Sequence, residues 1–466
     1  MIARLPDSEA LALLKDEDFL TLGRKADAMR ARLHPEGVVA FVIDRNINYT
    51  NVCTCQCRFC AFYRKPGDPA GYVLSTDEIL RKIGELTEHG GTSVLMQGGL
   101  NPDLRLAWFE DLFRAIKKRF PDITLHSLSP SEVAYLADLE GLTVRETLLR
   151  LKEAGLDSLP GGGAEVLVDG VRDAISPRKL KSSGWLGVME EAAGLGMRGT
   201  ATMMFGAGET DEEIILHLAR VRELQDRTGV FRAFIPWTFQ PLNTELAGEK
   251  GIKPASAIRY LRVLAVSRLY LDNVENVQAS WVTQGDKVAQ LALRFGANDM
   301  GSTMLEENVV RAAGVSFRIG IDRLVEIIRD AGFLPARRHA DYKIIQTFPG
   351  KDERAMTERR RDPRYSVTDL KLELKDGLSA KSINISSRGL YCTVDKRIPE
   401  FSKLKVSIDL PFSDGDVYKV TCDGVVVRCH PVKEGAHKAW STAIYFLNLE
   451  SDKAALIEDF LETVAK

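Results

Sequence analysis

The sequence predicts an α/β fold in two parts: a parallel, TIM-like β/α barrel with N-terminal helices, followed by a small antiparallel β-barrel. Three observations support this prediction. Short apolar segments alternate with longer helical segments over more than half of the chain, which is typical of parallel β/α units. Six or more such units indicate a barrel whose functional site lies at the carboxyl ends of the strands. A charged run then interrupts the alternation, and strand follows strand beyond it.

The elements of the first part follow one another in a regular order. Two helices are expected within Asp7–Leu33, and a strand rich in Val and Phe at Gly37–Asp44. Ser75 and Glu78 have the spacing of a capping box, which predicts a helix start. Further helices are predicted at Ser75–His89, Trp108–Phe120, Val144–Ala154, Leu180–Leu195, Asp211–Thr228 and Ser256–Ser267, and further strands at Thr92–Met96, Ile123–Ser127, Ser158–Leu159, Gly199–Phe205 and Arg232–Ile235.

A second domain is predicted after a linker. The run Phe348–Arg364 (FPGKDERAMTERRRDPR) is polar, charged and punctuated by Pro and Gly. We therefore divide the chain into a barrel at 1–347, a linker at 348–359 and a small β-barrel at 360–466. Its strands are expected at Leu370–Leu374, Ser379–Ile385, Leu390–Val394, Lys403–Leu410, Tyr418–Cys429 and Lys438–Phe446, with a closing helix at Lys453–Thr463.

Composition excludes several classes of function. The 466 residues carry 63 Lys and Arg against 65 Asp and Glu, so the chain lacks the basic surplus of a general nucleic-acid-binding protein. No run of 18 apolar residues is present, so no membrane span is expected. Met1–Pro6 is not followed by the apolar segment of a signal peptide. Together with seven Cys that suit a reducing compartment, this predicts a cytoplasmic protein.

The cysteines of Asn51–Arg64 (NVCTCQCRFCAFYR) carry the strongest chemical signal. Cys53, Cys57 and Cys60 have the spacing Cys-x3-Cys-x2-Cys, and three thiolates can hold three irons of a [4Fe–4S] cube, which normally takes four. Cys55 provides a fourth thiol, so a zinc ion held by four Cys is the alternative to the cluster. Structural zinc sites, however, usually divide their ligands between two separated pairs, and these thiols all lie in one short segment.

This segment, with Phe59 before the last thiol, resembles the radical S-adenosylmethionine (SAM) enzymes. The resemblance implies that SAM occupies the iron without a protein ligand, and that one electron cleaves it to methionine and a 5′-deoxyadenosyl radical. It also implies that Gln97, Gly98 and Gly99, after a predicted strand, contact SAM; an ordinary strand-to-helix turn is the alternative. A reduced flavodoxin or ferredoxin-like protein would be the electron donor.

Further loop motifs resemble one family within this group. They are His126–Pro130, Leu159–Glu165, Met203–Thr210, Phe234–Thr244, Gln278–Trp281 and Phe295–Asn308. From Pro35 to about Tyr342 the chain resembles the dehypoxanthine futalosine cyclases (cyclic dehypoxanthinyl futalosine synthases) of the futalosine route to menaquinone. The sister aminofutalosine synthases and deazaflavin-forming enzymes share the cysteine loop, and they remain the alternative enzymes.

The resemblance implies a cyclisation. The radical takes hydrogen from ribose C4′ of dehypoxanthine futalosine, the carbon radical adds to the benzoate ring, and an electron and a proton leave. Glu165 is the first candidate for the base and His126 the second, although either could instead bind ribose hydroxyls. Arg178 or Arg232 would meet the benzoate. The other cofactor-binding candidates are Phe59, Ser127, Gly206 and Glu209, and the other substrate-binding candidates are Gln240, Asn243, Asn298 and Asp299.

The second domain resembles the PilZ domain, which binds cyclic di-GMP, over about 358–464. Arg360, Arg361 and Arg364 form an Arg-rich motif, and Asn384, Ser386 and Gly389 form an Asn-x-Ser-x2-Gly motif. Paired guanidiniums suit phosphates and guanine edges. A solvated charge run is the alternative explanation for the arginines. The resemblance implies regulation of the barrel by a ligand that orders the linker, or a domain that only localises the enzyme. A cyclic di-GMP effector with an inactive barrel is the non-enzymatic alternative.

Overall fold

The chain folds into two compact units, Met1–Pro349 and Gly350–Lys466, in a computed structural model. The structure describes residues 4–249, 252, 254–349, 365–367, 370–374, 378–387, 389–399, 402–412, 415–434, 437–447 and 449–464. Each unit has its own cluster of buried apolar side chains. The predicted linker lies almost wholly outside the described residues, as do Arg360, Arg361 and Arg364.

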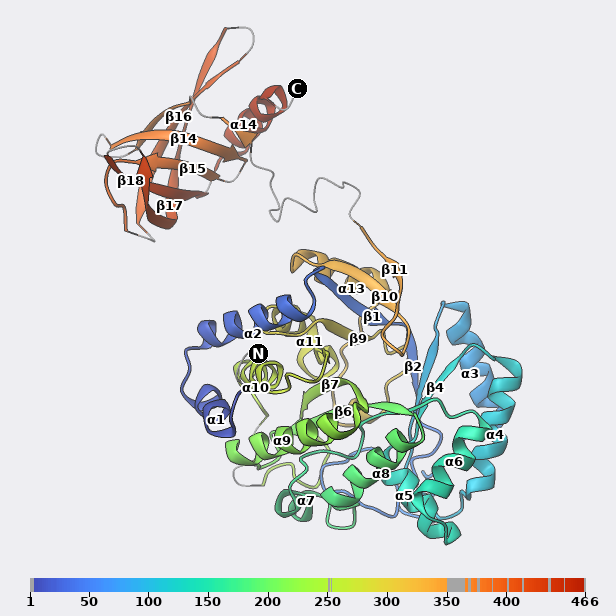
Figure 1. The fold of residues 1–466 in the computed structure, drawn as a ribbon. Helices are drawn as coiled ribbons and strands as arrows, with labels where there is room; N and C mark the ends of the chain where they lie inside the picture. The colour runs from blue at the N-terminus through green and yellow to red at the C-terminus, as the bar shows by residue number, and fades with distance from the viewer. Residues whose placement is uncertain are drawn as a thin grey trace. The chain divides into compact units, whose positions relative to one another are not determined.

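The first unit is built on a curled parallel sheet of seven strands (Figure 1). The strand order is β2-β3-β4-β5-β6-β7-β8, and every neighbouring pair is parallel. The strands are β2 (Asp44–Ile47), β3 (Ser93–Met96), β4 (Thr124–Ser127), β5 (Ser158–Leu159), β6 (Arg198–Phe205), β7 (Phe231–Thr238) and β8 (Asn276–Val277). This curled sheet confirms the barrel-type α/β fold that the alternation predicted.

A second sheet of four strands continues the ring. Its order is β11-β10-β1-β9, with β1 (Val38–Val42), β9 (Asp299–Ser302), β10 (Leu334–Arg338) and β11 (Ile344–Thr347). β1 leads directly into β2, and β9 pairs in parallel with β1. A single bridge between Gln278 and Asp299 links the end of β8 to β9, so neighbouring strands can be followed from β2 around to β1.

Helices cover the outside of this ring (Figure 1). The helices of this unit are α1 (Asp7–Lys15), α2 (Phe19–Leu33), α3 (Thr76–Glu88), α4 (Leu106–Arg119), α5 (Pro130–Glu140), α6 (Val144–Ala154), α7 (Asp169–Ile175), α8 (Ser182–Gly194), α9 (Asp211–Thr228), α10 (Ala257–Tyr270), α11 (Trp281–Ala292), α12 (Val309–Ala312), which lines the cavity, and α13 (Ile321–Asp330). Capping boxes at Ser75, Ser129, Thr143 and Thr210 start four of them. These caps fix where each loop ends and the next helix begins.

The second unit is a small antiparallel barrel followed by a helix. Its strand order is β12-β14-β13-β16-β17-β18-β15, and a further pairing between β14 and β15 closes the ring. The elements are β12 (Tyr365–Ser366), β13 (Lys371–Leu374), β14 (Leu378–Ser386), β15 (Gly389–Val394), β16 (Lys403–Pro411), β17 (Val417–Glu434), β18 (His437–Leu447) and α14 (Ser451–Val464). Ile457, Phe460 and Leu461 of α14 are buried in the core of this unit. In the described part of the chain no helix is long and apolar enough to cross a membrane.

Candidate active site

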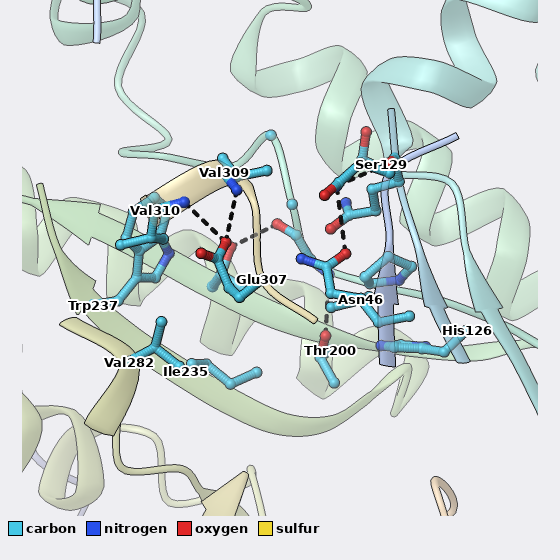
Figure 2. Close-up of a pocket in the computed structure, with 18 of the residues that line it drawn as sticks. Asn46, His126, Ser129, Thr200, Ile235, Trp237, Val282, Glu307, Val309 and Val310 are labelled. Carbon is cyan, nitrogen blue, oxygen red and sulfur yellow. Dashed lines mark hydrogen bonds between the residues drawn. The ribbon is translucent and has the colours of Figure 1, made fainter. Parts of the chain in front are cut away.

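A cavity of about 410 Å³ lies in the first unit, lined by the loop after β2 and by residues of most barrel strands. Ile235, Trp237 and Val282 form an apolar wall on one side, and Asn46, His126 and Ser129 lie across from it (Figure 2). A pocket with apolar walls and a few polar groups is the usual form of a small-molecule site. The predicted location, at the carboxyl ends of the strands and inside the barrel, is therefore where the structure has its cavity.

Four thiols line one end of this cavity. Cys53, Cys55, Cys57 and Cys60 all lie in the loop after β2. The backbone N–H of Leu100 donates to Sγ of Cys53 at 3.3 Å, and the thiols of Cys55 and Cys57 lie 3.4 Å apart in a hydrogen bond. Burial raises the pKa of the Cys53 and Cys60 thiols, so an electropositive partner is needed to keep them as thiolates.

The loop is held against the end of β3 at two glycines. A Cβ on Gly99 would lie 2.1 Å from the carbonyl oxygen of Val52 and 2.8 Å from Cβ of Cys53. A Cβ on Gly98 would lie 2.7 Å from the ring of Tyr49. Only residues without side chains allow this approach, so these glycines bring the Cys53 end of the loop against the strand end.

Glu132 holds the backbone of the turn at Gly98 in place through hydrogen bonds. Its Oε1 accepts from the Tyr49 hydroxyl at 2.5 Å and from the N–H of Gly98 at 2.9 Å, and its Oε2 accepts from the N–H of Ser129 at 2.6 Å. Burial raises the pKa of Glu132, and these hydrogen bonds oppose that shift. Glu132 is thus a buried group that orients the glycine turn, and all of its oxygens are engaged.

A buried ion pair lies beside the thiols. Nζ of Lys179 donates to Oε1 of Glu165 at 2.8 Å, and the guanidinium of Arg172 lies 3.5 Å from Oε2. Lys179 also faces the ring of Phe59, at 5.3 Å from its centroid. Burial acts to lower the pKa of Lys179, but Glu165 and the thiols of Cys57 and Cys55 raise it overall, so the ammonium is charged. This cation is the electropositive partner of the thiol loop.

His126 lies deeper in the cavity, on β4. Its Nδ1 and Oγ of Ser158 are joined by a hydrogen bond of 2.7 Å. Burial, reinforced by the charges of Arg232 and Arg338, lowers the pKa of His126 to about 3, so its ring is neutral near pH 7.

The floor of the cavity contains a second buried ion pair. Arg338, 4% exposed, donates from Nε and Nη2 to the carboxylate of Asp299, 0% exposed, at 2.5 and 2.8 Å. Its guanidinium stacks on Tyr342 at 3.8 Å from the ring centroid. Asp44 lines the same floor and accepts a hydrogen bond from Ser302. Burial raises the pKa of Asp44 to about 6, although Ser302 and Arg338 oppose the shift.

Comparison with known proteins places this cavity in a family. The model of the radical SAM superfamily matches residues 47–221, that of the CofH/MqnC C-terminal region matches 228–350, and that of the PilZ domain matches 358–463. The cyclic dehypoxanthine futalosine synthase of Halalkalibacterium halodurans is 48% identical over 75% of this chain and 94% of its own length. That of Streptomyces coelicolor is 46% identical over 75% of this chain and 88% of its own.

This chain belongs to the cyclic dehypoxanthine futalosine synthase family of radical SAM proteins. A more distant relative, the 5-amino-6-(D-ribitylamino)uracil–L-tyrosine 4-hydroxyphenyl transferase of Methanopyrus kandleri, is 39% identical over 70% of this chain and 94% of its own. Among solved structures, methylornithine synthase matches with TM-score 0.57 at 21% identity, over 72% of this chain and 95% of its own. The FeFe-hydrogenase maturase HydG of Carboxydothermus hydrogenoformans matches with TM-score 0.58 at 18% identity, over 73% and 77%. These two matches support the barrel fold.

The thiol end of the cavity suits the [4Fe–4S] cluster and SAM of this superfamily. Cys53, Cys57 and Cys60 supply three thiolate donors to one cavity, and glycines hold their loop in place. In the described residues, no three His, Cys, Asp or Glu side chains converge as a site for a single metal ion. A cube binds each thiolate to a different iron, so its ligands need not converge on one point. The donor set therefore fits the cluster.

The structure brings some of the residues predicted for the site together. The cavity is lined by the predicted residues Cys53, Cys57, Phe59, Cys60, Gln97, Gly98, Gly99, His126 and Glu165. Sequence analysis missed Lys179, Glu132, Asp44 and Arg338. Lys179 and Arg338 were missed because their partners are distant in sequence. Glu132 was missed because it has the position of a helix-capping residue, which gives no chemical signal.

The predicted cofactor residues Ser127, Gly206 and Glu209 lie outside the cavity lining. Ser127 is buried on the opposite side of β4 from His126, because side chains alternate along a strand. Glu209 accepts from the N–H groups of Gly206 and Ala207 at 2.7 and 3.0 Å. It therefore closes its own loop in this structure.

The predicted substrate residues also lie outside the lining. Arg178 is exposed, and Arg232 is half-buried, with its backbone oxygen bonded to Asn276. The amides of Gln240 and Asn243 donate to the carbonyl oxygens of Thr238 and Ala312. Asn298 is buried between Arg268 and Asn276, and Asp299 is the partner of Arg338. These polar groups support the loops and strands around the cavity.

The PilZ domain places its second motif at a tight strand junction. Asn384 and Ser386 lie at the end of β14, and Gly389 starts β15. The Ser386 hydroxyl donates to the carbonyl oxygen of Gly389 at 3.4 Å. A Cβ on Gly389 would lie 2.6 Å from the backbone oxygen of Ile444, so this glycine allows β18 to approach. The arginines of the first motif fall outside the described residues.

Proposed function

We propose that this chain converts dehypoxanthine futalosine into its cyclic form, as a radical SAM enzyme of menaquinone biosynthesis. The observation that carries the proposal is the 48% identity to a cyclic dehypoxanthine futalosine synthase over 94% of that relative's length. The cavity supports it, because four thiols line one end and apolar and polar walls continue into the barrel.

The bound cluster and SAM would supply the one-electron cleavage that starts hydrogen removal from ribose C4′. The chain's own residues bind and orient. Cys53, Cys57 and Cys60 would hold the cluster, and Gln97 with the Gly98–Gly99 backbone would lie against SAM. Ile235, Trp237 and Val282 would exclude water and stray hydrogen donors from the reacting carbon.

Of the two predicted bases, His126 has the freer proton-accepting atom. Glu165 is held between Lys179, at 2.8 Å from Oε1, and Arg172, at 3.5 Å from Oε2, so its carboxylate is already engaged by two cations. His126 is neutral, its Nδ1 is bonded to Ser158, and no described residue hydrogen-bonds Nε2. Nε2 is therefore free to accept a hydrogen bond from a ribose hydroxyl, whereas burial and the charges of Arg232 and Arg338 disfavour full protonation of the ring. Glu165 would instead hold the ammonium group of Lys179 in position beside the thiols.

An anaerobic assay tests the proposed reaction. The reconstituted full chain would receive SAM, a one-electron reductant and dehypoxanthine futalosine, and mass spectrometry would follow the products. We expect 5′-deoxyadenosine and a product two hydrogens lighter than the substrate. 5′-Deoxyadenosine formed while the substrate remains intact would refute the cyclase and redirect the assay to the aminofutalosine and deazaflavin-type substrates.

Two further assignments accompany this proposal. The cluster needs a strong one-electron donor, for which we propose a reduced flavodoxin or ferredoxin-like protein. The free thiols of the cavity require a reducing compartment, so we propose that the protein acts in the cytoplasm.

We also propose that the PilZ domain binds cyclic di-GMP. The domain model covers 358–463, and the sequence has both the Arg motif and the Asn-x-Ser-x2-Gly motif within it. Titration calorimetry of the full chain should show binding that Arg364→Ala abolishes, with Lys396→Ala as the matched surface control. Equal heats from wild type and Arg364→Ala would contradict the assignment.

A further inference from the structure

Only two Lys or Arg side chains are found among the described residues that line the cavity, and they lie at different levels. Lys179 pairs with Glu165 beside the thiols. Arg338 lies in the floor, at the level of Val42, because Phe41 pairs with Arg337. The thiol loop follows Ile47, five residues further along β1 and β2, which corresponds to roughly 16 Å of extended chain. The cavity therefore has a cation near each end.

The guanidinium of Arg338 is held in place by hydrogen bonds, but these bonds do not engage all of its N–H groups. Nε and Nη2 donate to Asp299, and Nη1 donates to the carbonyl oxygen of His339 at 3.1 Å. Tyr342 covers one face of the group. A guanidinium has five N–H donors, so the partners found in the described residues take three and leave two on the Nη1 and Nη2 atoms. Those atoms present the geometry that binds a carboxylate.

Charged groups of both signs lie in and around the floor. Arg338 lines it, and Arg232 is close enough to affect the charge state of His126 and Tyr342. Asp299 is paired with Arg338, and burial raises the pKa of Asp44 to about 6, so Asp44 is mostly ionised at pH 7. His126 is neutral. The cation that lines the floor is therefore Arg338, which is paired with Asp299 and lies near the carboxyl of Asp44.

We propose that Arg338 binds the carboxylate of the substrate's aromatic ring and so selects a benzoate-bearing substrate. This inference rests on the proposed function and assigns the end of the cavity that the ring occupies. With the carboxylate on Arg338, the ring lies along Ile235 and Trp237, and the ribose reaches toward the thiol end. Asp299, which the sequence suggested as a substrate contact, is then a positioning residue that orients the guanidinium.

The test compares the natural substrate with its carboxamide, which keeps the shape and loses the charge. For the wild type, we expect kcat/KM to fall about 10- to 100-fold for the carboxamide, mostly through KM. For Arg338→Gln, kcat/KM for the acid should fall by a similar factor, and the acid-to-amide ratio should drop toward one. Arg338→Lys should restore part of that ratio, because it restores the charge without the fork.

Controls separate this role from a structural one. Arg24→Gln removes an exposed Arg outside the lining and should keep the wild-type ratio. Because Arg338→Gln leaves Asp299 buried without its partner, the double variant Arg338→Gln/Asp299→Asn guards against misfolding, with iron content and substrate-free SAM cleavage as checks. A wild-type ratio in either folded Arg338→Gln variant would overturn the inference while leaving the cyclase intact. A wild type without cyclase activity would overturn the proposed function itself.

Discussion

Glu165 combines an unusual backbone conformation with a buried, charge-paired side chain. It has φ of 41°, in the left-handed region that few residues other than glycine adopt, and it is 4% exposed. This conformation follows Gly161–Gly163 and turns the carboxylate toward Lys179. Strained backbone at a functional loop persists only when its surroundings hold it. Here the pair with Lys179 provides that support and places a cation beside the cluster ligands.

Cys55 is the thiol whose role separates a cluster from other metal sites. All four thiols line the cavity, but the family spacing uses Cys53, Cys57 and Cys60. We expect Cys55→Ser to keep wild-type iron and the EPR signal of the reduced cluster. Cys57→Ser should lose most of both, because one iron would lack its thiolate. Iron analysis after anaerobic reconstitution measures this. Loss of the cluster in Cys55→Ser would show that the fourth thiol is a ligand.

Asp44 should make stability depend on pH in a direction opposite to most carboxyl groups. Its folded-state pKa of about 6 lies above the ordinary value of 3.8. Between these two pH values the folded protein keeps a proton on Asp44 that the unfolded chain has lost. The stability contributed by Asp44 is therefore full below about pH 3.8 and is lost as the pH rises through about 6.

The variant Asp44→Asn isolates this effect. Between pH 5 and pH 8 the free energy of unfolding of the wild type should fall by about 1 kcal/mol more than that of Asp44→Asn. The buried His126 is neutral in both proteins, so its contribution cancels. Chemical unfolding under anaerobic conditions measures the difference. Parallel pH profiles would mean that Asp44 is ionised normally.

Among the elements, the turn after β3 is the one that most directly sets the thiol loop. We predict that Gly99→Ala displaces Val52 and Cys53, because the new Cβ would lie 2.1 Å from a backbone oxygen that cannot move independently. The variant should lose about 2 kcal/mol or more of stability and most of its iron. Melting temperature and iron content measure both effects.

Gly187→Ala is the matched control for this change. Gly187 lies in α8, and a Cβ there has no neighbour within 4 Å. Alanine favours a helix interior by up to about 1 kcal/mol, so this variant should be slightly more stable and load iron normally. If Gly99→Ala behaved like Gly187→Ala, the close approach of the turn would not control cluster binding.

Sequence patterns predicted the amphipathic and capped elements well. The helices Val144–Ala154 and Asp211–Thr228 have the predicted bounds, because each begins at a capping box and α6 buries one face. α5 was missed, since it buries residues around much of its surface and has little amphipathic pattern. β9 was missed because its partner β1 lies far away in the chain. Such pairings leave no local pattern.

The site was predictable where one segment carries its chemistry. Cys53, Cys57 and Cys60 are within one loop, so their spacing alone indicated a cluster. Arg338 lies 39 residues after its partner Asp299, and neither has a local motif that announces the pair. His126 and Ser127 are adjacent, and sequence analysis assigned both to the site. Strand alternation admits only His126 to the cavity lining.

At the scale of the whole molecule, the two units are built to fold on separate cores. The first core contains buried residues from Ala10 to Phe333, and the second contains buried residues from Leu370 to Leu461. Neither cluster draws a described residue from the other unit. Each unit therefore has its own source of hydrophobic stabilisation, as expected for domains.

Calorimetry of the full chain should accordingly show two unfolding transitions. Cyclic di-GMP at about 100 times its Kd should stabilise one of them by about 2.7 kcal/mol, because it binds only the folded PilZ domain. The Arg364→Ala chain should show both transitions without that shift. If the ligand also regulates the enzyme, it should change SAM-dependent turnover by about 5- to 150-fold, the usual range of allosteric coupling. A single transition that shifts as a whole with cyclic di-GMP would contradict independent folding, because it would require the two cores to unfold as one cooperative unit.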